Sequence, residues 1–82
     1  MKEQFPLSEI GDGESVIIRS IEASALKVKL MEMGLIEGKS IDVLFRAPLG
    51  DPIAINIDGY VLSLRQDEAC MILVEPLKLM HS

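Results

Sequence analysis

The side chains that could support chemistry are few, and their spacing matches no catalytic or metal-binding pattern. Among the 82 residues, Cys70 is the only cysteine and His81 is the only histidine. A Cys/His zinc site usually needs four ligands, and covalent catalysis needs a nucleophile, a base and an orienting group that converge. His81 also lies beside the C-terminus, where chains fray. We therefore predict no catalytic residue, no metal ligand and no cofactor, and we expect that the protein is not an enzyme.

Carboxylates could pair for acid–base chemistry or hold a cation through their oxygen atoms. The candidates are Asp51, Asp58, Asp67 and Glu68. Each has a simpler role in a turn, at a helix start or on a solvated face, and no EF-hand spacing occurs. Cys70 is expected to lie in an apolar strand, where a free cysteine behaves as a small hydrophobic residue. We interpret all of these groups as structural.

The segment Gly34-Leu-Ile-Glu-Gly38-Lys39-Ser40 resembles a phosphate-binding loop. It has three residues between its glycines, whereas that loop needs four. A predicted helix precedes the segment and a predicted strand follows it, so the helix would present its C-terminal end, which repels phosphate. We interpret the segment as a turn.

The charge balance excludes several classes of partner. The chain has 13 acidic and 8 basic residues, which gives a net charge of −5. Binding to nucleic acid or to anionic lipid depends on clustered Lys and Arg, and no stretch here clusters them. A single cysteine, the lack of any apolar run near 20 residues and the lack of a signal peptide predict a cytosolic protein.

Five segments are predicted to be strands, because apolar and β-branched residues alternate in short runs between turn residues. They cover residues 15–21, 41–45, 53–57, 60–64 and 70–75. Asp58-Gly59, between the third and fourth runs, is typical of a type I′ hairpin turn. Phe45 and Tyr60 are expected to point into the core. Residues 66–69 are predicted to form one helical turn.

Residues 23–33 are predicted to form a helix, because apolar side chains recur on one face. These side chains are Leu26, Leu30 and Met33. Ser24 is the predicted N-cap. Gly34 is expected to end the helix in the left-handed conformation, which would place Leu35 against Leu30, as in a Schellman ending.

Five short strands and one helix leave few architectures for a chain of this length. A sheet that curls into a small barrel removes exposed edges that would invite aggregation. We predict a mainly β fold, a small SH3-like five-stranded barrel with one α-helix inserted between the first and second strands. It forms a single domain over residues 1–82, with a core at about residues 7–76 and a C-terminal tail at residues 77–82.

Two apolar features are candidates for contact with a partner protein. One amphipathic helix cannot turn every apolar residue at its end inward, and exposed Met and Leu side chains often mark interaction surfaces. The residues concerned are Met31, Met33, Leu35 and Ile36. The alternative is that this corner only folds over the core. Leu49 is the second feature, because the tip of a turn tends to present its side chain.

The turn around Leu49 has residues that we predict to shape it without contacting the partner. They are Pro48, Gly50, Asp51, Pro52 and Arg65. Pro48 and Gly50 suit a type I turn. Arg65 could hold loop carbonyls, or pair with Asp51 through two parallel hydrogen bonds.

These residues also carry a resemblance to a known family. Ala47-Pro-Leu-Gly-Asp-Pro-Ile53, followed by Gly59-Tyr60 and Leu62-Ser-Leu-Arg65, is similar to FeoA, the small cytosolic protein of bacterial ferrous iron uptake. The segment from Lys29 to Gly38 resembles the helix and turn of that family. The resemblance covers about residues 7–75, and it departs at Lys29, where the family more often carries Arg.

The resemblance implies an SH3-like fold without catalytic activity. It also implies a partner, FeoB, the membrane ferrous iron transporter with a cytosolic GTPase domain, which could recruit the protein to the inner face of the membrane. The family is also associated with transition-metal binding, but this sequence offers no set of metal ligands. The alternatives are a generic SH3-like peptide-binding module and a stand-alone relative of the C-terminal domain of iron-dependent repressors. Both activation and restraint of the transporter fit the sequence, as does self-association.

Overall fold

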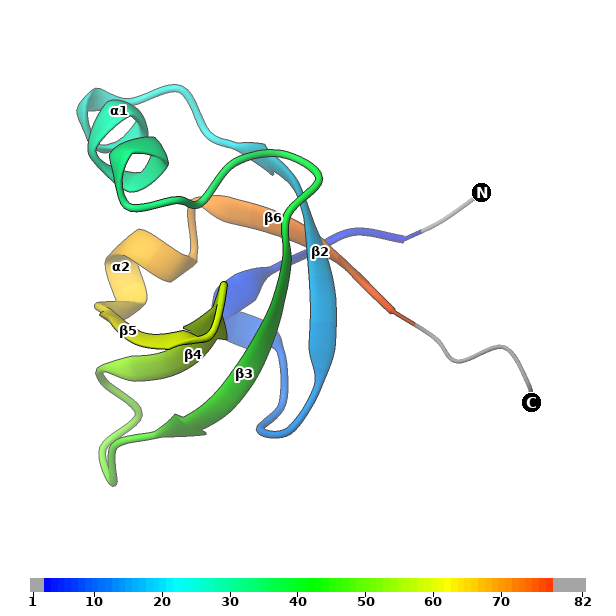
Figure 1. Ribbon diagram of the computed structural model, residues 1–82. Coiled ribbons are helices and arrows are strands. Elements are labelled where there is room, and N and C mark those ends of the chain that lie inside the picture. The colour runs from blue at the N-terminus through cyan, green and yellow to red at the C-terminus, as the bar shows by residue number, and fades with distance from the viewer. Residues whose placement is uncertain (1–2, 78–82) are drawn as a thin grey trace.

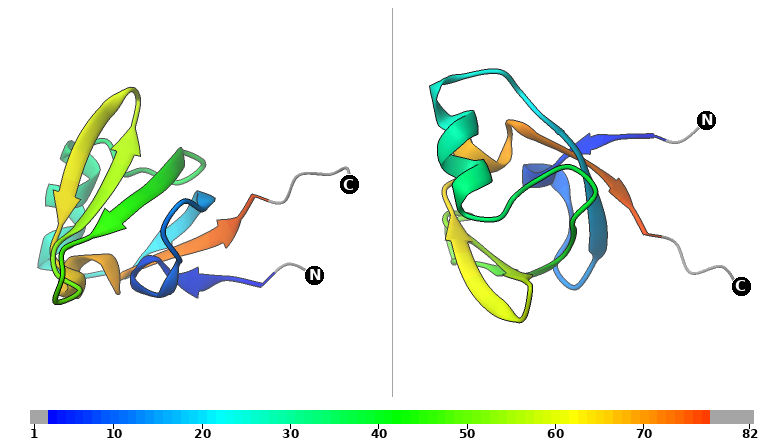
Figure 2. Two further views of the ribbon diagram at one scale, coloured as in Figure 1. Left: turned by 90° about the horizontal axis from the view of Figure 1, so that it is seen from below. Right: turned by 45° about the horizontal axis from the view of Figure 1, so that its top comes forward.

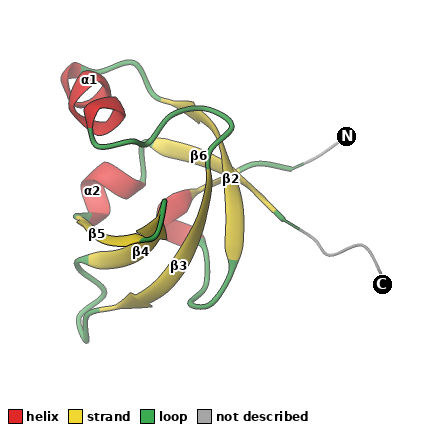
Figure 3. Cartoon of the chain, viewed as in Figure 1, coloured by secondary structure: helices red, strands yellow, loops and turns green. Residues whose placement is uncertain are grey.

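The computed structural model describes residues 3–77, and within this range one curled sheet carries three short helices in its connections (Figure 1, Figure 3). The six strands are β1 (Phe5–Pro6), β2 (Ser15–Ile21), β3 (Ser40–Arg46), β4 (Ile53–Ile57), β5 (Tyr60–Leu64) and β6 (Ile72–Pro76). The helices are the 3-10 helix η1 (Leu7–Glu9) and the α-helices α1 (Ala25–Glu32) and α2 (Gln66–Ala69).

The strands follow the order β1-β6-β2-β3-β4-β5, so β1 and β5 are the two edges of the sheet. All of the pairings are antiparallel, and the sheet curls into an open barrel (Figure 2). The mainly β fold with a helix between the first two predicted strands is confirmed. The structure adds β1, a strand of two residues that the sequence pattern does not predict.

The core is built from apolar side chains that alternate along the strands. Ile53, Ile55 and Ile57 of β4 are fully buried, as are Val16 and Ile18 of β2. Burying a side chain of this size contributes about 1.5–3 kcal/mol relative to leaving it exposed. The inner face of the sheet therefore supplies much of the hydrophobic stabilisation.

The β4–β5 hairpin has the predicted type I′ turn. Asp58 and Gly59 both adopt left-handed backbone conformations, with φ of 53° and 86°. The two-residue loop brings Ile57 opposite Tyr60 and sets the register of the whole strand pair.

Helix α1 begins and ends through the predicted local interactions. The Ser24 hydroxyl accepts a hydrogen bond from the Leu26 N–H at 3.2 Å and so caps the first turn. Gly34 has a φ of 100°, and the Leu35 N–H donates to the Leu30 carbonyl at 3.1 Å. This is the Schellman ending, and it buries Leu30 and Leu35 completely.

The predicted burial of the two strand aromatics is wrong. The register of β3 against β4 shifts between Val43 and Phe45, and the extra residue reverses the alternation, so Phe45 is 57% exposed. Tyr60 is also about half exposed. It lies at the hairpin end of an edge strand, where its hydroxyl donates to the Met33 carbonyl at 3.2 Å.

The prediction that Cys70 lies in a closing strand is also wrong. Cys70 follows α2 as its C-cap and is exposed, and β6 begins only at Ile72. Its thiol donates to the Asp67 carbonyl at 3.1 Å. The residue therefore belongs to a helix end and not to the apolar strand. His81 lies outside the described residues.

Candidate partner-binding surface

The β3–β4 loop presents Leu49 at the tip of a tight turn. The Gly50 N–H donates to the Ala47 carbonyl at 2.7 Å, and the Ala47 N–H donates to the Pro52 carbonyl at 3.0 Å. Pro48 occupies the second position of the turn, where its fixed φ is suitable. Leu49 is 96% exposed, so its side chain contributes almost nothing to the core. It is free to contact another molecule.

Asp51 connects this loop to the next helix. Its carboxylate accepts a hydrogen bond from the Gln66 N–H at 3.0 Å, at the start of α2. The bidentate pair predicted between Arg65 and Asp51 is absent from the described residues. The Arg65 side chain is 75% exposed, and its Nε lies 3.9 Å from a carboxylate oxygen of Asp67. Arg65 therefore does not shape the loop through its side chain.

The α1–β3 corner exposes only some of the predicted contact residues. Met31 and Ile36 are 44% and 42% exposed, while Met33 is partly buried against the core. Leu35 is fully buried, because the Schellman ending turns it onto Leu30. Leu35 is consequently removed from the candidate surface, and Met33 contributes to it only in part.

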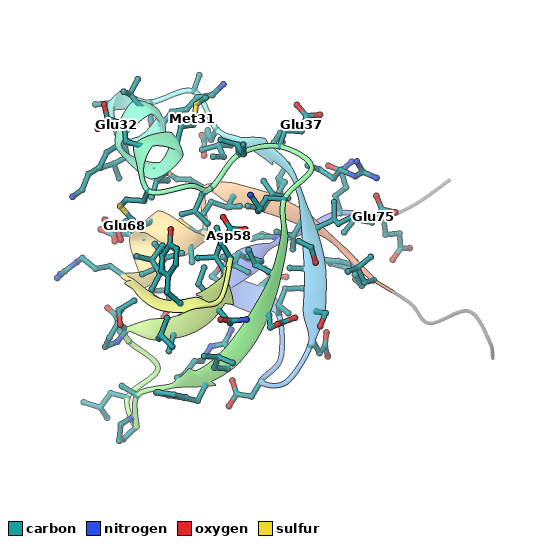
Figure 4. All side chains as sticks on the ribbon, in the orientation of Figure 1. Met31, Glu32, Glu37, Asp58, Glu68 and Glu75 are labelled. Atoms are coloured by element: carbon teal, nitrogen blue, oxygen red, sulfur yellow. The ribbon has the colours of Figure 1, made fainter. Side chains whose placement is uncertain are left out.

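Met31 and Ile36 line a shallow hollow of about 170 Å³ between the end of β2, α1 and the α1–β3 connection. The lining residues are Ser20, Ile21, Lys27, Met31, Ile36 and Glu37. Figure 4 shows Met31 and Glu37 at this end of the molecule. The hollow forms where three consecutive segments of the chain, between residues 20 and 37, pack together, so the periodicity of a single strand or helix does not identify Ser20 or Lys27. Its lining combines three apolar side chains, Ile21, Met31 and Ile36, with one serine, one basic and one acidic side chain.

The two surfaces lie at opposite ends of the molecule. In Figure 1 the α1–β3 corner is at the top, and the β3–β4 loop is at the bottom. The structure therefore does not bring Leu49 and Met31 together. A partner that contacts both must extend along the side of the barrel.

The candidate acid–base carboxylates have structural roles. Asp58 pairs with Lys39 at 3.0 Å, and Glu68 accepts a hydrogen bond from the Arg65 N–H at 2.9 Å (Figure 4). Lys29 approaches Glu68 only at 4.0 Å. Within residues 3–77, no group of three or more His, Cys, Asp or Glu side chains converges as a metal site would require.

Asp42, on β3, has two hydrogen-bond donors beside its carboxylate. Its carboxylate accepts hydrogen bonds from the Ser15 hydroxyl at 2.6 Å and from the Asn56 amide at 3.3 Å. The Ser15 hydrogen bond is the main reason that the pKa of Asp42 is lowered, and the Asn56 bond adds to it against partial burial. Asp42 thus joins β2, β3 and β4.

We expect Ser15→Ala to lower the free energy of unfolding by about 1 kcal/mol near pH 7, where Asp42 is ionised. Because the folded pKa of Asp42 is lowered, this stabilisation is present above its unfolded pKa and is lost as pH falls through the folded pKa. The difference between wild type and variant should therefore shrink on going to about pH 2.5. Urea unfolding followed by circular dichroism measures it. A difference independent of pH would contradict the assignment to the ionised carboxylate.

Comparison with known proteins identifies the family. The FeoA domain model matches residues 5–76. The chain belongs to the FeoA domain family. The family functions in ferrous iron transport, and its SH3-like fold agrees with the sheet described above.

Three relatives show what this FeoA domain is similar to. It is 39% identical over 70 residues to the Fe(2+) transport protein A/Fe(2+) transporter FeoB fusion protein of Porphyromonas gingivalis, covering 84% of this chain and 8% of that one. The FeoA-like protein of Clostridium acetobutylicum is 38% identical with a TM-score of 0.89, covering 100% and 96%. The FeoA of Stenotrophomonas maltophilia, an SH3 domain protein complexed with zinc, is 25% identical with a TM-score of 0.72, covering 83% and 86%.

A manganese-dependent transcriptional repressor shares the fold alone. It has a TM-score of 0.82 at 21% identity, and it covers 94% of this FeoA domain and 44% of its own chain. Within residues 3–77, neither α-helix has the length and apolar character needed to cross a bilayer.

Proposed function

We propose that this protein is a non-catalytic accessory of bacterial ferrous iron uptake that docks on the cytosolic part of a FeoB-type transporter. The observation that carries the proposal is the Porphyromonas gingivalis relative, in which an FeoA domain and FeoB form one polypeptide. Fusion keeps two domains at a high effective concentration, which favours weak contact between them. A separate FeoA domain needs a surface of its own to reach the same arrangement.

The exposed apolar side chains supply two such surfaces. Leu49 is 96% exposed on a loop held by backbone hydrogen bonds, so little ordering entropy is lost when it binds. The hollow beside Met31 and Ile36 can accept one apolar side chain of the transporter. We propose Leu49 as the principal contact and the hollow as the second.

A proline-rich peptide is a weaker candidate ligand, although two aromatic side chains are exposed. Phe45 lies opposite Ala54, and Tyr60 lies opposite Ile57. Their partners Ala54 and Ile57 are three residues apart on β4, and residues at that spacing point to opposite faces of the sheet. Directly opposite residues on paired strands share a face. Phe45 and Tyr60 therefore cannot line one groove of the kind that such peptides occupy.

We expect Leu49→Asp to weaken binding to the cytosolic part of the FeoB-type transporter by about 10-fold or more, because a charge replaces the central apolar contact. Titration calorimetry with purified proteins at micromolar concentration measures the Kd. Val28→Asp is the matched control, since Val28 is also exposed (63%) but lies on α1 and does not line the hollow. Equal affinities for Leu49→Asp and wild type would remove Leu49 from the interface. No binding by wild type would overturn the docking proposal.

A further inference from the structure

The two edges of the sheet are protected very differently. β1 has two residues, one of which is Pro6, and short strands with proline resist pairing with other chains. β5 is five residues long, Tyr-Val-Leu-Ser-Leu, with no charge and no proline. Its register against β4 is continuous, without a bulge. β5 (yellow in Figure 2) forms the margin of the sheet, and no further strand pairs with it within residues 3–77.

The hairpin determines which backbone groups of β5 point outward. A two-residue turn makes Ile57 and Tyr60 a hydrogen-bonded pair, and such pairs alternate along an antiparallel ladder. The N–H and C=O groups of Leu62 therefore face β4, while those of Val61 and Ser63 face away from it. Val61 is 62% exposed and Ser63 is exposed. Four backbone groups are thus available on the open edge.

We propose that this edge pairs with the same edge of a second copy of the chain, as an antiparallel two-strand junction with Leu62 at the two-fold axis. In this register Val61 of each copy lies opposite Ser63 of the other. The four outward N–H and C=O groups of one strand then meet those of the other in four hydrogen bonds. The contact is self-complementary, as a two-fold interface requires.

Charge at the ends of the strand also favours a second copy. The proposed register places Arg65 opposite Gly59 of the other copy and next to its Asp58. Arg65 is 75% exposed, and Asp58, which also pairs with Lys39 of its own chain, is 51% exposed and can accept a second cation. Opposite charges therefore meet at both ends of the junction, while the strand between them is uncharged. A pairing displaced by one residue would lose this match and would turn hydrogen-bonding groups away from each other.

The experiment is sedimentation equilibrium of wild type, Ser63→Pro and Ser63→Ala from about 10 µM to about 1 mM, since a small interface predicts a Kd on the order of 0.1–1 mM. Proline removes only the outward N–H of Ser63, which the β4–β5 ladder does not use, so the monomer keeps its fold. We expect the Kd of Ser63→Pro to rise about 10-fold or more, because two of four hydrogen bonds are lost. Ser63→Ala keeps the N–H and should dimerise like wild type.

Two further measurements keep the test decisive if Ser63→Pro fails to fold. Arg65→Glu alters an exposed side chain and places like charges at both ends, so it should also weaken the dimer. An isotope-filtered NMR experiment on mixed labelled and unlabelled wild type should show contact between the Leu62 α-protons of two copies. A wild type that stays monomeric at 1 mM, or a dimer unaffected by both variants, would overturn the proposal. A third result would also overturn it: wild type is monomeric, and Ser63→Pro only weakens binding to the transporter. The β5 edge would then pair with a segment of the transporter and not with a second copy.

Discussion

Replacing Leu35 with alanine is expected to lower the free energy of unfolding by about 2–5 kcal/mol. Leu35 is fully buried and follows the left-handed Gly34, where it packs on Leu30 at the end of α1. The shortened side chain leaves a cavity under the α1–β3 corner, and domains of this size have total stabilities of only about 5–15 kcal/mol. Urea unfolding followed by circular dichroism measures the change.

Leu49→Ala is the matched control for this prediction. The same truncation at a side chain that is 96% exposed should change the stability by less than about 0.5 kcal/mol. A similar loss in both variants would contradict the burial difference on which the candidate surface rests. The stability of each variant is also needed to interpret binding assays. Because Leu35 is buried, a Leu35 variant that binds the transporter poorly does so because it is partly unfolded and not because it has lost a contact.

Local sequence patterns predict those parts of the fold that depend on neighbouring residues. The Asp58-Gly59 turn and the Gly34 helix end need only backbone conformations that glycine and aspartate favour over a few residues. The register shift between Val43 and Phe45 in β3 has no such signature, because the residue types of a bulged strand are the same as those of a regular strand. Phe45 is exposed for this reason, although strict alternation places it in the core.

The candidate partner-binding surface also combines features that local sequence predicts with features that it does not. The exposure of Leu49 follows from a local turn and is predictable. The burial of Leu35 follows from the Schellman ending at Gly34. The same residues suggest both that Leu35 packs on Leu30 and that it is exposed to a partner, and only the direction of its side chain decides between the two. The hollow beside Met31 depends on how β2 meets α1, and the angle between two successive elements cannot be predicted from the residue pattern of either one.

One predicted role is assigned to the wrong residue, and it concerns Arg46 and Arg65, the two arginines at strand ends. Sequence reasoning assigns the role of holding loop carbonyls to Arg65, which follows β5. In the structure Arg46, at the end of β3, has that role. Its guanidinium donates to the Ser8 carbonyl at 2.8 Å and to the Ile10 carbonyl at 2.6 Å. The two carbonyls belong to η1 (Ser8) and to the residue that follows it (Ile10), 38 and 36 residues away in sequence.

Arg46→Met is therefore expected to lower the free energy of unfolding by about 2–4 kcal/mol, because three hydrogen bonds are lost together. Besides the two carbonyls, Arg46 donates to a carboxylate oxygen of Asp12 at 2.9 Å, and only 23% of its side chain is exposed. Methionine keeps the apolar stem, so the loss reports the guanidinium contacts and not the packing. Arg65→Met is the matched control, and at micromolar concentration it should cost less than about 0.5 kcal/mol. Equal losses at the two positions would show that the carbonyl contacts of Arg46 contribute little, and that η1 and Ile10 are held mainly by the burial of Leu7 and Ile10.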